Sequence, residues 1–483
     1  MATLRQSLLI NFAQNYGIIV IQFTASIILA RLLSPAEIGI FSVAATLIAL
    51  AQAVRDFGVG QYIVQEKELN AERIRSAFTV TLIVAVILAA ITASLCTVAA
   101  DFYREPGVRN VMLVLALNFL LIPFGQITLG YLQREMKFGA IAQVKIGSTI
   151  VHFAVSISLA YMGFSYMSLA YASLANVLSS AVIANLHRPK DMPWSLGFGE
   201  VRRVLSFGSF SVMTNIAAAL AKGVSDLVVG RMINMASVGL FSRASGLIEI
   251  FNQGVMNALW AVALPHFSKA AREGGDIRSD FLQSACLITG LAWPFFCVLT
   301  LLAEPMVLLL YGQTWIDCIP LVKWICLAFW IVAPFYLFSS VLVAIGQVKK
   351  VMWIEICSLP IQFGLYIIGA LTGDLEKVAA ANVVYAVFKV FIVYFILKKY
   401  LMFSNIQFFT NLWKSLIVMV LSSVVCWAAL QLFSHPSSSH WASIFIGGTG
   451  ATLGWISGVF VSRHPLSKEL KSVFSRGIAS VKA

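Results

Sequence analysis

Long apolar segments recur along the whole chain and constrain its fold more than any other feature. A helix needs about 20 mostly apolar residues to cross a bilayer. Of the 483 residues, 59% are hydrophobic and only 11% are charged, and the mean hydropathy is +0.87. Soluble domains do not have this composition, so the sequence predicts an all-α polytopic membrane protein with about 14 transmembrane helices. The predicted spans are 8–33, 38–59, 76–99, 108–129, 141–162, 166–186, 205–229, 238–264, 280–302, 319–345, 351–371, 378–397, 412–432 and 441–461.

A sequence repeat indicates that the first twelve spans form two equivalent, pseudo-symmetric bundles. Residues 29–48 return at residues 229–248, with eight identities in twenty pairs at a constant offset of 200. Composition alone gives about two identities, and internal duplication is common among membrane transporters. In the first copy, the identical positions are Arg31, Ala36, Gly39, Phe41, Ser42, Ala44, Leu47 and Ile48. The predicted organisation is an N-terminal six-helix bundle at 1–190, a second at 191–400, two additional transmembrane helices at 401–465 and a basic cytoplasmic tail at 466–483.

The distribution of Lys and Arg predicts the orientation in the membrane. With the N-terminus inside, the predicted cytoplasmic segments hold 24 Lys and Arg side chains and the external segments hold 6. Basic residues are retained on the cytoplasmic side, so both termini are predicted to be cytoplasmic. The same rule accounts for the net charge of +13 without a nucleic-acid partner. The tail at 466–483 is expected either to lie on the membrane surface or to be a frayed end.

Charged residues inside a membrane are costly and are candidates for function. Lys222, Arg243 and Lys389 place three positive charges in the second bundle. Arg243 occupies the repeat position of Val43, so the cation is a departure from the repeat. These residues predict a cationic cavity for a phosphate-bearing or acidic substrate. Arg55, at the end of the second span, is either a further cavity residue or a side chain that snorkels to the interface.

Acidic and neutral polar residues complete the set of candidates. Asp226 lies four residues after Lys222, so the two either neutralise each other or line a cavity. Asp226 and Glu249 are the candidates for ion coupling. Asn15 and Asn215 share a repeat position and are predicted to offer hydrogen bonds to a wet interior. Four prolines interrupt apolar spans and are expected to act as bends: Pro123, Pro294, Pro334 and Pro360.

Motifs of enzymes and metal sites do not occur in the sequence. There is no GxxxxGK[ST] loop for ATP, no GxSxG and no HExxH, and the seven cysteines form no CxxC pair. The external connections are short, so no sizeable catalytic domain fits between the spans. The expectation is therefore a transporter with no cofactor and no metal, and a membrane glycan polymerase or transferase is the less favoured alternative.

Five stretches of the chain carry a family likeness. They are ARLLSPAEIGIFSVA, DFGVGQYIVQEKEL, YLQREMKF, LLYGQTWIDCIPLVKWICL and SRHPL. Together they resemble the Wzx-type, colanic-acid-exporter-like branch of polysaccharide transporters in the multidrug/oligosaccharidyl-lipid/polysaccharide flippase superfamily. The most specific parts are the Phe57-Gly58 turn, the loop from Tyr311 to Trp315, and the ending Ser462-Arg463-His464-Pro465. The resemblance covers essentially the whole chain and implies two six-helix bundles around a central cavity, with two further helices.

The resemblance also implies a function, to be tested below. It implies an inner-membrane flippase that moves undecaprenyl-pyrophosphate-linked oligosaccharide repeat units for exopolysaccharide, capsule or O-antigen assembly by alternating access. A glycan polymerase and a chain-length regulator are the protein partners that it suggests. A peptidoglycan-precursor or multidrug transporter of the same superfamily is the alternative. Coupling to protons, sodium ions or the membrane potential stays open.

Overall fold

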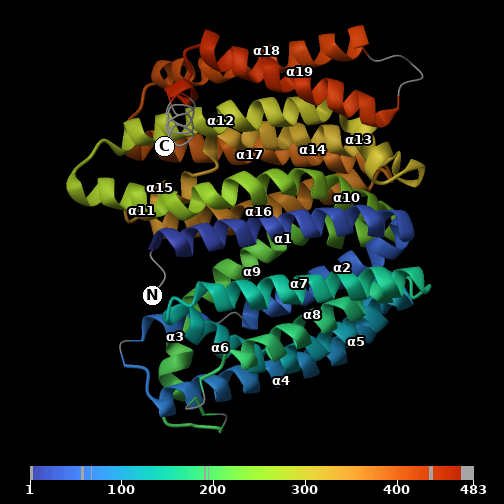
Figure 1. Ribbon diagram of the computed structural model, residues 1–483, viewed down its shortest axis with the longest axis vertical. Coiled ribbons are helices and arrows are strands. Elements are labelled where there is room, and N and C mark those ends of the chain that lie inside the picture. The colour runs from blue at the N-terminus through green and yellow to red at the C-terminus, as the bar shows by residue number, and fades with distance from the viewer. Residues whose placement is uncertain are drawn as a thin grey trace, which may run out of the picture. The chain divides into compact units, whose positions relative to one another are not determined.

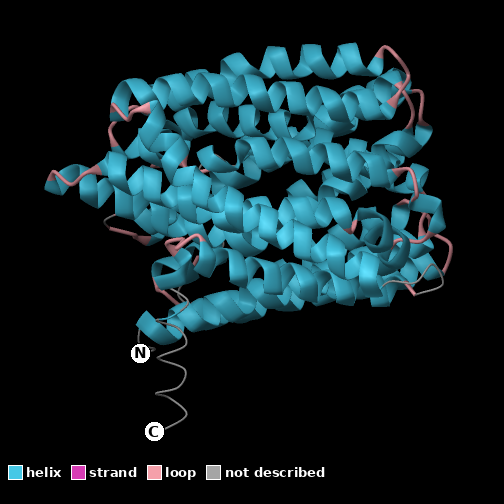
Figure 2. Cartoon of the chain, turned by 90° about the horizontal axis from the view of Figure 1, so that it is seen from above, coloured by secondary structure: helices cyan, strands magenta, loops and turns pink. Residues whose placement is uncertain are grey.

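The computed structural model describes residues 4–55, 59–66, 68–189, 192–193, 195–433, 439–468 and 471. Within these ranges every regular element is a helix and no strand occurs (Figure 2). The side chains of residues 4–13, 59, 61, 202–212 and 214 lie outside the description. The α-helices are α1 (Leu4–Leu32), α2 (Pro35–Arg55), α3 (Val59–Gln65), α4 (Ala71–Tyr103), α5 (Pro106–Leu121), α6 (Pro123–Arg134), α7 (Phe138–Tyr161), α8 (Met167–Leu186), α9 (Val201–Met232), α10 (Met235–Phe251), α11 (Asn257–Glu273), α12 (Ile277–Leu301), α13 (Ala303–Leu310), α14 (Cys318–Val332), α15 (Phe338–Ala344), α16 (Val348–Ala370), α17 (Leu375–Leu401), α18 (Asn405–Phe433) and α19 (His440–Val461).

The predicted all-α polytopic membrane fold is confirmed. Among the described residues, 12 helices are long and apolar enough to cross a membrane, or 13 when α5 and the bent continuation α6 count as one span. α9 is not among these 13, but its 32 residues make a helix about 48 Å long, enough to cross a bilayer. α9 covers the predicted span at 205–229.

The chain divides into two compact units, with the boundary between residues 242 and 243. The first unit contains α1 to α9 and the beginning of α10, and the second contains the rest. In the first unit, α7 packs against α8 and α1, α4 packs against α5, and α2 packs against α5 and α9 (Figure 1). Since α9 packs on α2 and α4, the first helix of the second repeat adjoins the first bundle. The boundaries expected from the repeat, at 190 and 400, stay predictions.

The repeated segments have the same local structure. α1 ends at Leu32 and α9 at Met232, while α2 begins at Pro35 and α10 at Met235, so the offset of 200 holds for each boundary. Each second helix is also capped at its start. The Ser34 backbone N–H donates to Glu37 Oε2 at 2.6 Å. In the second copy, the Ser237 backbone N–H donates to Asn234 Oδ1 at 2.8 Å.

Two repeated glycines bring the repeats into contact. A Cβ at Gly39 would collide with the Met235 carbonyl, and a Cβ at Gly239 would collide with the Pro35 carbonyl. One helical turn further, Ser42 Oγ donates to Ser242 Oγ at 3.3 Å. Equivalent residues thus meet each other, as they do about a two-fold axis, and only glycine permits this backbone approach.

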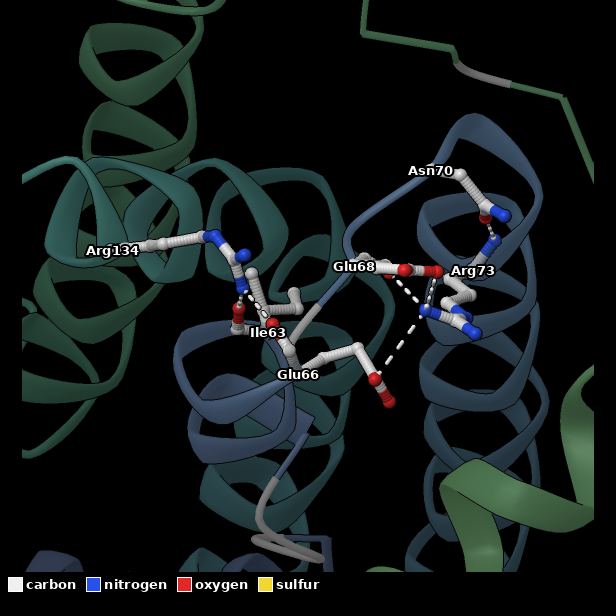
Figure 3. Close-up of polar contacts among 6 residues, drawn as sticks. All are labelled: Ile63, Glu66, Glu68, Asn70, Arg73 and Arg134. Carbon is white, nitrogen blue, oxygen red and sulfur yellow. Dashed lines mark hydrogen bonds and ion pairs between the residues drawn. The ribbon is translucent and has the colours of Figure 1, made fainter.

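Two of the stretches that carry the family likeness contact each other at one end of the first unit. Arg134, at the end of α6, donates to the carbonyls of Ile63, at 2.9 Å, and Glu66 (Figure 3). Arg73 binds Glu66 Oε1 at 3.4 Å and the Glu68 carbonyl, and its own backbone N–H is capped by Asn70 (Figure 3). These bonds cap the end of α3 and fix it against α6. The Phe57-Gly58 turn lies outside the described residues.

In the second unit, α18 and α19 pack side by side and α18 packs on α12 (Figure 1). The side chain of His464, just after α19, is fully buried. Its Nε2 lies 3.1 Å from Ser415 Oγ on α18 and 3.3 Å from Cys286 Sγ on α12. The segment Ser462-Arg463-His464-Pro465, which carries part of the family likeness, therefore connects α19 with α18 and α12. Of the predicted basic tail, residues 469, 470 and 472–483 lie outside the described residues.

Candidate functional site

A bent helix shapes a polar pocket in the first unit. α5 ends at Leu121, and α6 continues from Pro123 at an angle of 49°. Proline has no N–H to donate and its ring crowds the preceding turn, so it bends a helix. Gly125 then lets α6 approach α8, because a Cβ at this position would lie 3.1 Å from Ala181 Cα. The bend expected at Pro123 is present.

Polar side chains hold the bent helix against α8. Asn118 Nδ2 donates to Ser173 Oγ at 3.0 Å, just before the bend. After the bend, Asn185 Nδ2 donates to the Phe124 carbonyl at 3.0 Å. The second bond joins the first turn of α6 to α8. The bend is therefore fixed on both sides and the pocket beside it is preformed.

The pocket has a volume of about 260 Å³ and lies between α2, the α5–α6 bend and α8. Its polar lining comes from Arg55, Gln126, Asn176 and Ser180. Gln126 Oε1 is buried and has no hydrogen-bond partner among the described residues. Asn176 is oriented by its Nδ2, which donates to the Ser148 carbonyl at 2.9 Å. The pocket thus offers a cation for an anionic group and an acceptor for a hydroxyl donor.

The other candidates of the first unit lie elsewhere. Asp226 Oδ2 accepts a hydrogen bond from Thr46 Oγ1 at 3.0 Å, so α9 is tied to α2 through this carboxylate. Lys222 and Asn15 are exposed, and Asn215 is half-buried on α9. None of these four residues lines the pocket that contains Arg55.

The two predicted cations of the second unit are held by different neighbours. The Arg243 guanidinium lies 6.0 Å from the ring centroid of Trp315, in the loop that carries part of the family likeness. Lys389 Nζ lies 3.0 and 3.1 Å from the two carboxylate oxygens of Glu355 on α16. Glu355 is not among the residues predicted from the sequence. Lys389 therefore belongs to an ion pair between α16 and α17.

Glu249 lies next to a departure from α-helical geometry. Residues Asn252–Met256 form a π-helix between α10 and α11, and π-turns are frequent at functional sites. Asn252 Nδ2 donates to Glu249 Oε2 at 3.2 Å. The amide thereby orients the carboxylate that is the second candidate for ion coupling.

Sequence reasoning identified Arg55 but did not connect it with Gln126 and Asn176. The signal was present, because a proline and two amides occur in apolar spans. Their convergence depends on the packing of α6 on α8, which the sequence does not reveal. In the described part of the chain, no group of three or more His, Cys, Asp or Glu side chains is arranged to hold a metal ion.

These features define the class of the protein. A helical chain with this many candidate membrane spans and a duplicated hairpin is a multi-pass membrane protein. Residues 28–320 match the family described as "Polysaccharide biosynthesis protein", and the chain belongs to this family.

Several characterised sequences are similar over most of their length. The lipopolysaccharide biosynthesis protein WzxC of Escherichia coli (strain K12) is 21% identical over 95% of this chain and 93% of its own. The teichuronic acid biosynthesis protein TuaB of Bacillus subtilis (strain 168) is 20% identical over 86% of this chain and 87% of its own. The succinoglycan biosynthesis transport protein ExoT of Rhizobium meliloti (strain 1021) is 26% identical over 74% of this chain and 72% of its own. The family likeness expected from the five stretches is confirmed.

Solved structures share the fold. The lipid II flippase MurJ in an inward closed conformation has a TM-score of 0.75 at 13% identity, covering 94% of this chain and 98% of that one. An inward-facing multidrug resistance MATE family transporter of the MOP superfamily has a TM-score of 0.57 at 16% identity, covering 84% and 97%. At these identities the likeness concerns the fold alone.

Proposed function

We propose that this protein is a flippase for lipid-linked oligosaccharide repeat units in polysaccharide assembly. The family and its relatives in lipopolysaccharide, teichuronic acid and succinoglycan biosynthesis support a polysaccharide unit over a drug or a peptidoglycan precursor. The proposed carrier is undecaprenyl pyrophosphate in the inner membrane, with both termini of the protein in the cytoplasm. A glycan polymerase and a chain-length regulator are the proposed neighbours in the pathway.

The pocket of the first unit is the observation that carries this proposal. A repeat unit on a pyrophosphate carries both anionic oxygens and many hydroxyl groups. Arg55 supplies a positive charge for the anionic oxygens. The buried, unpartnered Gln126 Oε1 accepts a hydrogen bond from a hydroxyl group. A volume of about 260 Å³ holds roughly one sugar ring or one phosphate group with its neighbours, so the pocket contacts only part of the substrate.

Movement of the substrate is proposed to follow alternating access, in which two repeats rock about a central site. Asp226 and Glu249 remain the proposed residues for coupling to protons, sodium ions or the membrane potential. Lys222, Arg243 and Lys389 remain proposed contacts of the anionic substrate, and Lys389 reaches this role only by leaving Glu355.

The test is the export of polysaccharide by cells that carry pocket variants in place of the native protein. Arg55→Ala removes a charge-assisted hydrogen bond worth about 1.5–3 kcal/mol, which corresponds to an export rate roughly 10 to 100 times lower. Gln126→Leu is expected to lower export less, and Arg55→Lys to restore part of it. Lipid-linked repeat units should then accumulate on the cytoplasmic face.

Arg109→Ala is the matched control, because Arg109 is an exposed arginine of the same unit outside the pocket. Its export should equal that of the native protein at equal membrane abundance. Normal export by Arg55→Ala would overturn the assignment of the pocket. Repeat units accumulating on the outer face, as after loss of a polymerase, would overturn the proposed function.

A further inference from the structure

The second unit contains a larger cavity with a different character. Its volume is about 860 Å³, and it lies between α12, α14 and α18, with the first turn of α17 at one side. Apolar side chains form most of the lining, including Phe296, Leu327 and Val424. The four helices belong to the same unit (Figure 1). Leu327 and Val424 of this lining are exposed, and exposed apolar side chains on membrane-spanning helices face lipid, so the cavity accepts hydrocarbon chains.

Rigid aromatic residues shape one wall of this cavity. The rings of Trp330 and Trp293 are stacked, with centroids 5.1 Å apart and planes inclined by 27°. The Trp330 indole N–H donates to Met419 Sδ at 3.1 Å, and both Trp330 and Met419 line the cavity. Because these side chains fix each other, the cavity is preformed and does not need a ligand to open it.

Two opposite charges line the same cavity without pairing. Lys323 on α14 and Glu376 on α17 are both exposed. Within the described part of the chain, neither takes part in an ion pair, although both lie at one cavity. A cation and an anion held apart beside an apolar groove complement a ligand whose own charges are separated by a short linker. Both residues lie within the first two turns of their helices, on the predicted external side, so such a ligand comes from the outer leaflet.

We propose that this cavity binds phosphatidylethanolamine, a zwitterionic phospholipid. Lys323 contacts the phosphate, Glu376 accepts hydrogen bonds from the primary ammonium group, and an acyl chain fills the groove between α12, α14 and α18. The lipid thereby bridges the additional helix α18 to α14 and α17. This binding site is separate from the pocket of Arg55 and does not depend on the identity of the transported glycan.

The experiment uses the purified full-length protein in lipid nanodiscs that contain either phosphatidylethanolamine or anionic phosphatidylglycerol. Native mass spectrometry counts the lipids that stay bound, and thermal unfolding reports whether they stabilise the protein. Phosphatidylethanolamine should be retained preferentially and should raise the melting temperature. Loss of one charge-assisted contact by Lys323→Ala or Glu376→Gln should weaken retention of this lipid about tenfold.

Matched variants separate lipid binding from a general loss of charge. Lys377→Ala removes an exposed cation next to Glu376, and Glu304→Gln removes an exposed carboxylate from the first turn of α13; neither residue lines the cavity. Both controls should retain the lipid as the native protein does. Ser423→Trp, which fills the cavity without changing charge, should exclude it. Equal retention of both lipids, or unchanged retention in Lys323→Ala and Glu376→Gln, overturns the proposal.

Discussion

Lys389 on α17 and Glu355 on α16 form an ion pair inside apolar helices. Lys389 seemed to be an isolated cation in an apolar span, but Glu355, 34 residues earlier, holds it with two short contacts. A carboxylate and an ammonium group enter a membrane at lower cost together than apart. The pair consequently stabilises the packing of α16 on α17, and its charge is available to a substrate only when the pair opens.

His464 gives the protein a pH dependence that the sequence alone does not predict. Burial is the main cause that lowers the pKa of His464 from 6.5 to about 4, and the positive charge of Lys414 acts in the same direction, whereas a hydrogen bond to the Cys286 backbone opposes it. His464 Nδ1 accepts the Leu466 N–H at 3.2 Å, so Nε2 carries the proton that it shares with Ser415 and Cys286. The neutral ring is therefore the form that fits the folded protein.

The stability contributed by neutral His464 is complete above pH 6.5 and decreases as the pH falls toward 4, because the unfolded chain then binds a proton that the folded chain does not. The melting temperature of the purified protein should therefore fall between pH 7 and pH 5. In His464→Gln, whose side chain does not titrate, this fall should be smaller, although the variant is less stable at pH 7. Identical pH profiles for the two proteins would contradict this account.

At the scale of helices, four prolines in apolar spans were predicted to produce bends. Pro123 produces the bend of 49°, and Pro334 lies in a 3-10 turn between α14 and α15. Pro294 and Pro360, in contrast, lie inside continuous helices, and a bend at these two positions stays a prediction. A proline frees the carbonyl four residues earlier. For Pro294 this is the carbonyl of Gly290, which accepts a hydrogen bond from the indole N–H of Trp455 at 2.9 Å. For Pro334 it is the carbonyl of Trp330, which accepts one from the indole N–H of Trp293, also at 2.9 Å.

Trp455→Phe tests this use of an indole as a substitute donor. The variant keeps the aromatic volume but leaves the Gly290 carbonyl without its donor from α19, at a cost of about 1–3 kcal/mol. A lower melting temperature of the purified protein is expected. Trp441→Phe, at an exposed position at the start of α19, should change it little. If both substitutions had the same small effect, the hydrogen bond would not stabilise the contact between α19 and α12.

The sequence was sufficient for much of the fold and for only part of the site. Apolar length predicted the spans, because it is a local property. The offset of 200 predicted the matching ends of α1 and α9, because similar segments form similar local structure. The pocket depends on how Gln126 from α6 and Asn176 from α8 meet beside Arg55. These contacts between helices depend on close packing at residues such as Gly125 and Ala181, and no pattern in a single sequence predicts such packing.

At the scale of the whole molecule, the contact between the repeats is the feature that a transport cycle must change. Gly39 lies against the Met235 carbonyl and Gly239 against the Pro35 carbonyl, on the side predicted to be external. Alternating access requires the two repeats to separate on one side and to approach on the other. A covalent link at this contact should therefore hold the external side closed and stop transport, whichever glycan is carried.

The pair Ser42→Cys and Ser242→Cys provides this link, since the two hydroxyl oxygens are 3.3 Å apart and cysteines at such a spacing form a disulfide with little movement. Under oxidising conditions, polysaccharide export by the double variant should fall at least about tenfold, and a reductant should restore it. Each single variant serves as a control for the seven native cysteines and should export normally under both conditions. Undiminished export by a fully crosslinked protein would show that the two repeats stay together at this contact throughout the cycle, and the rocking movement would then have to take place around it.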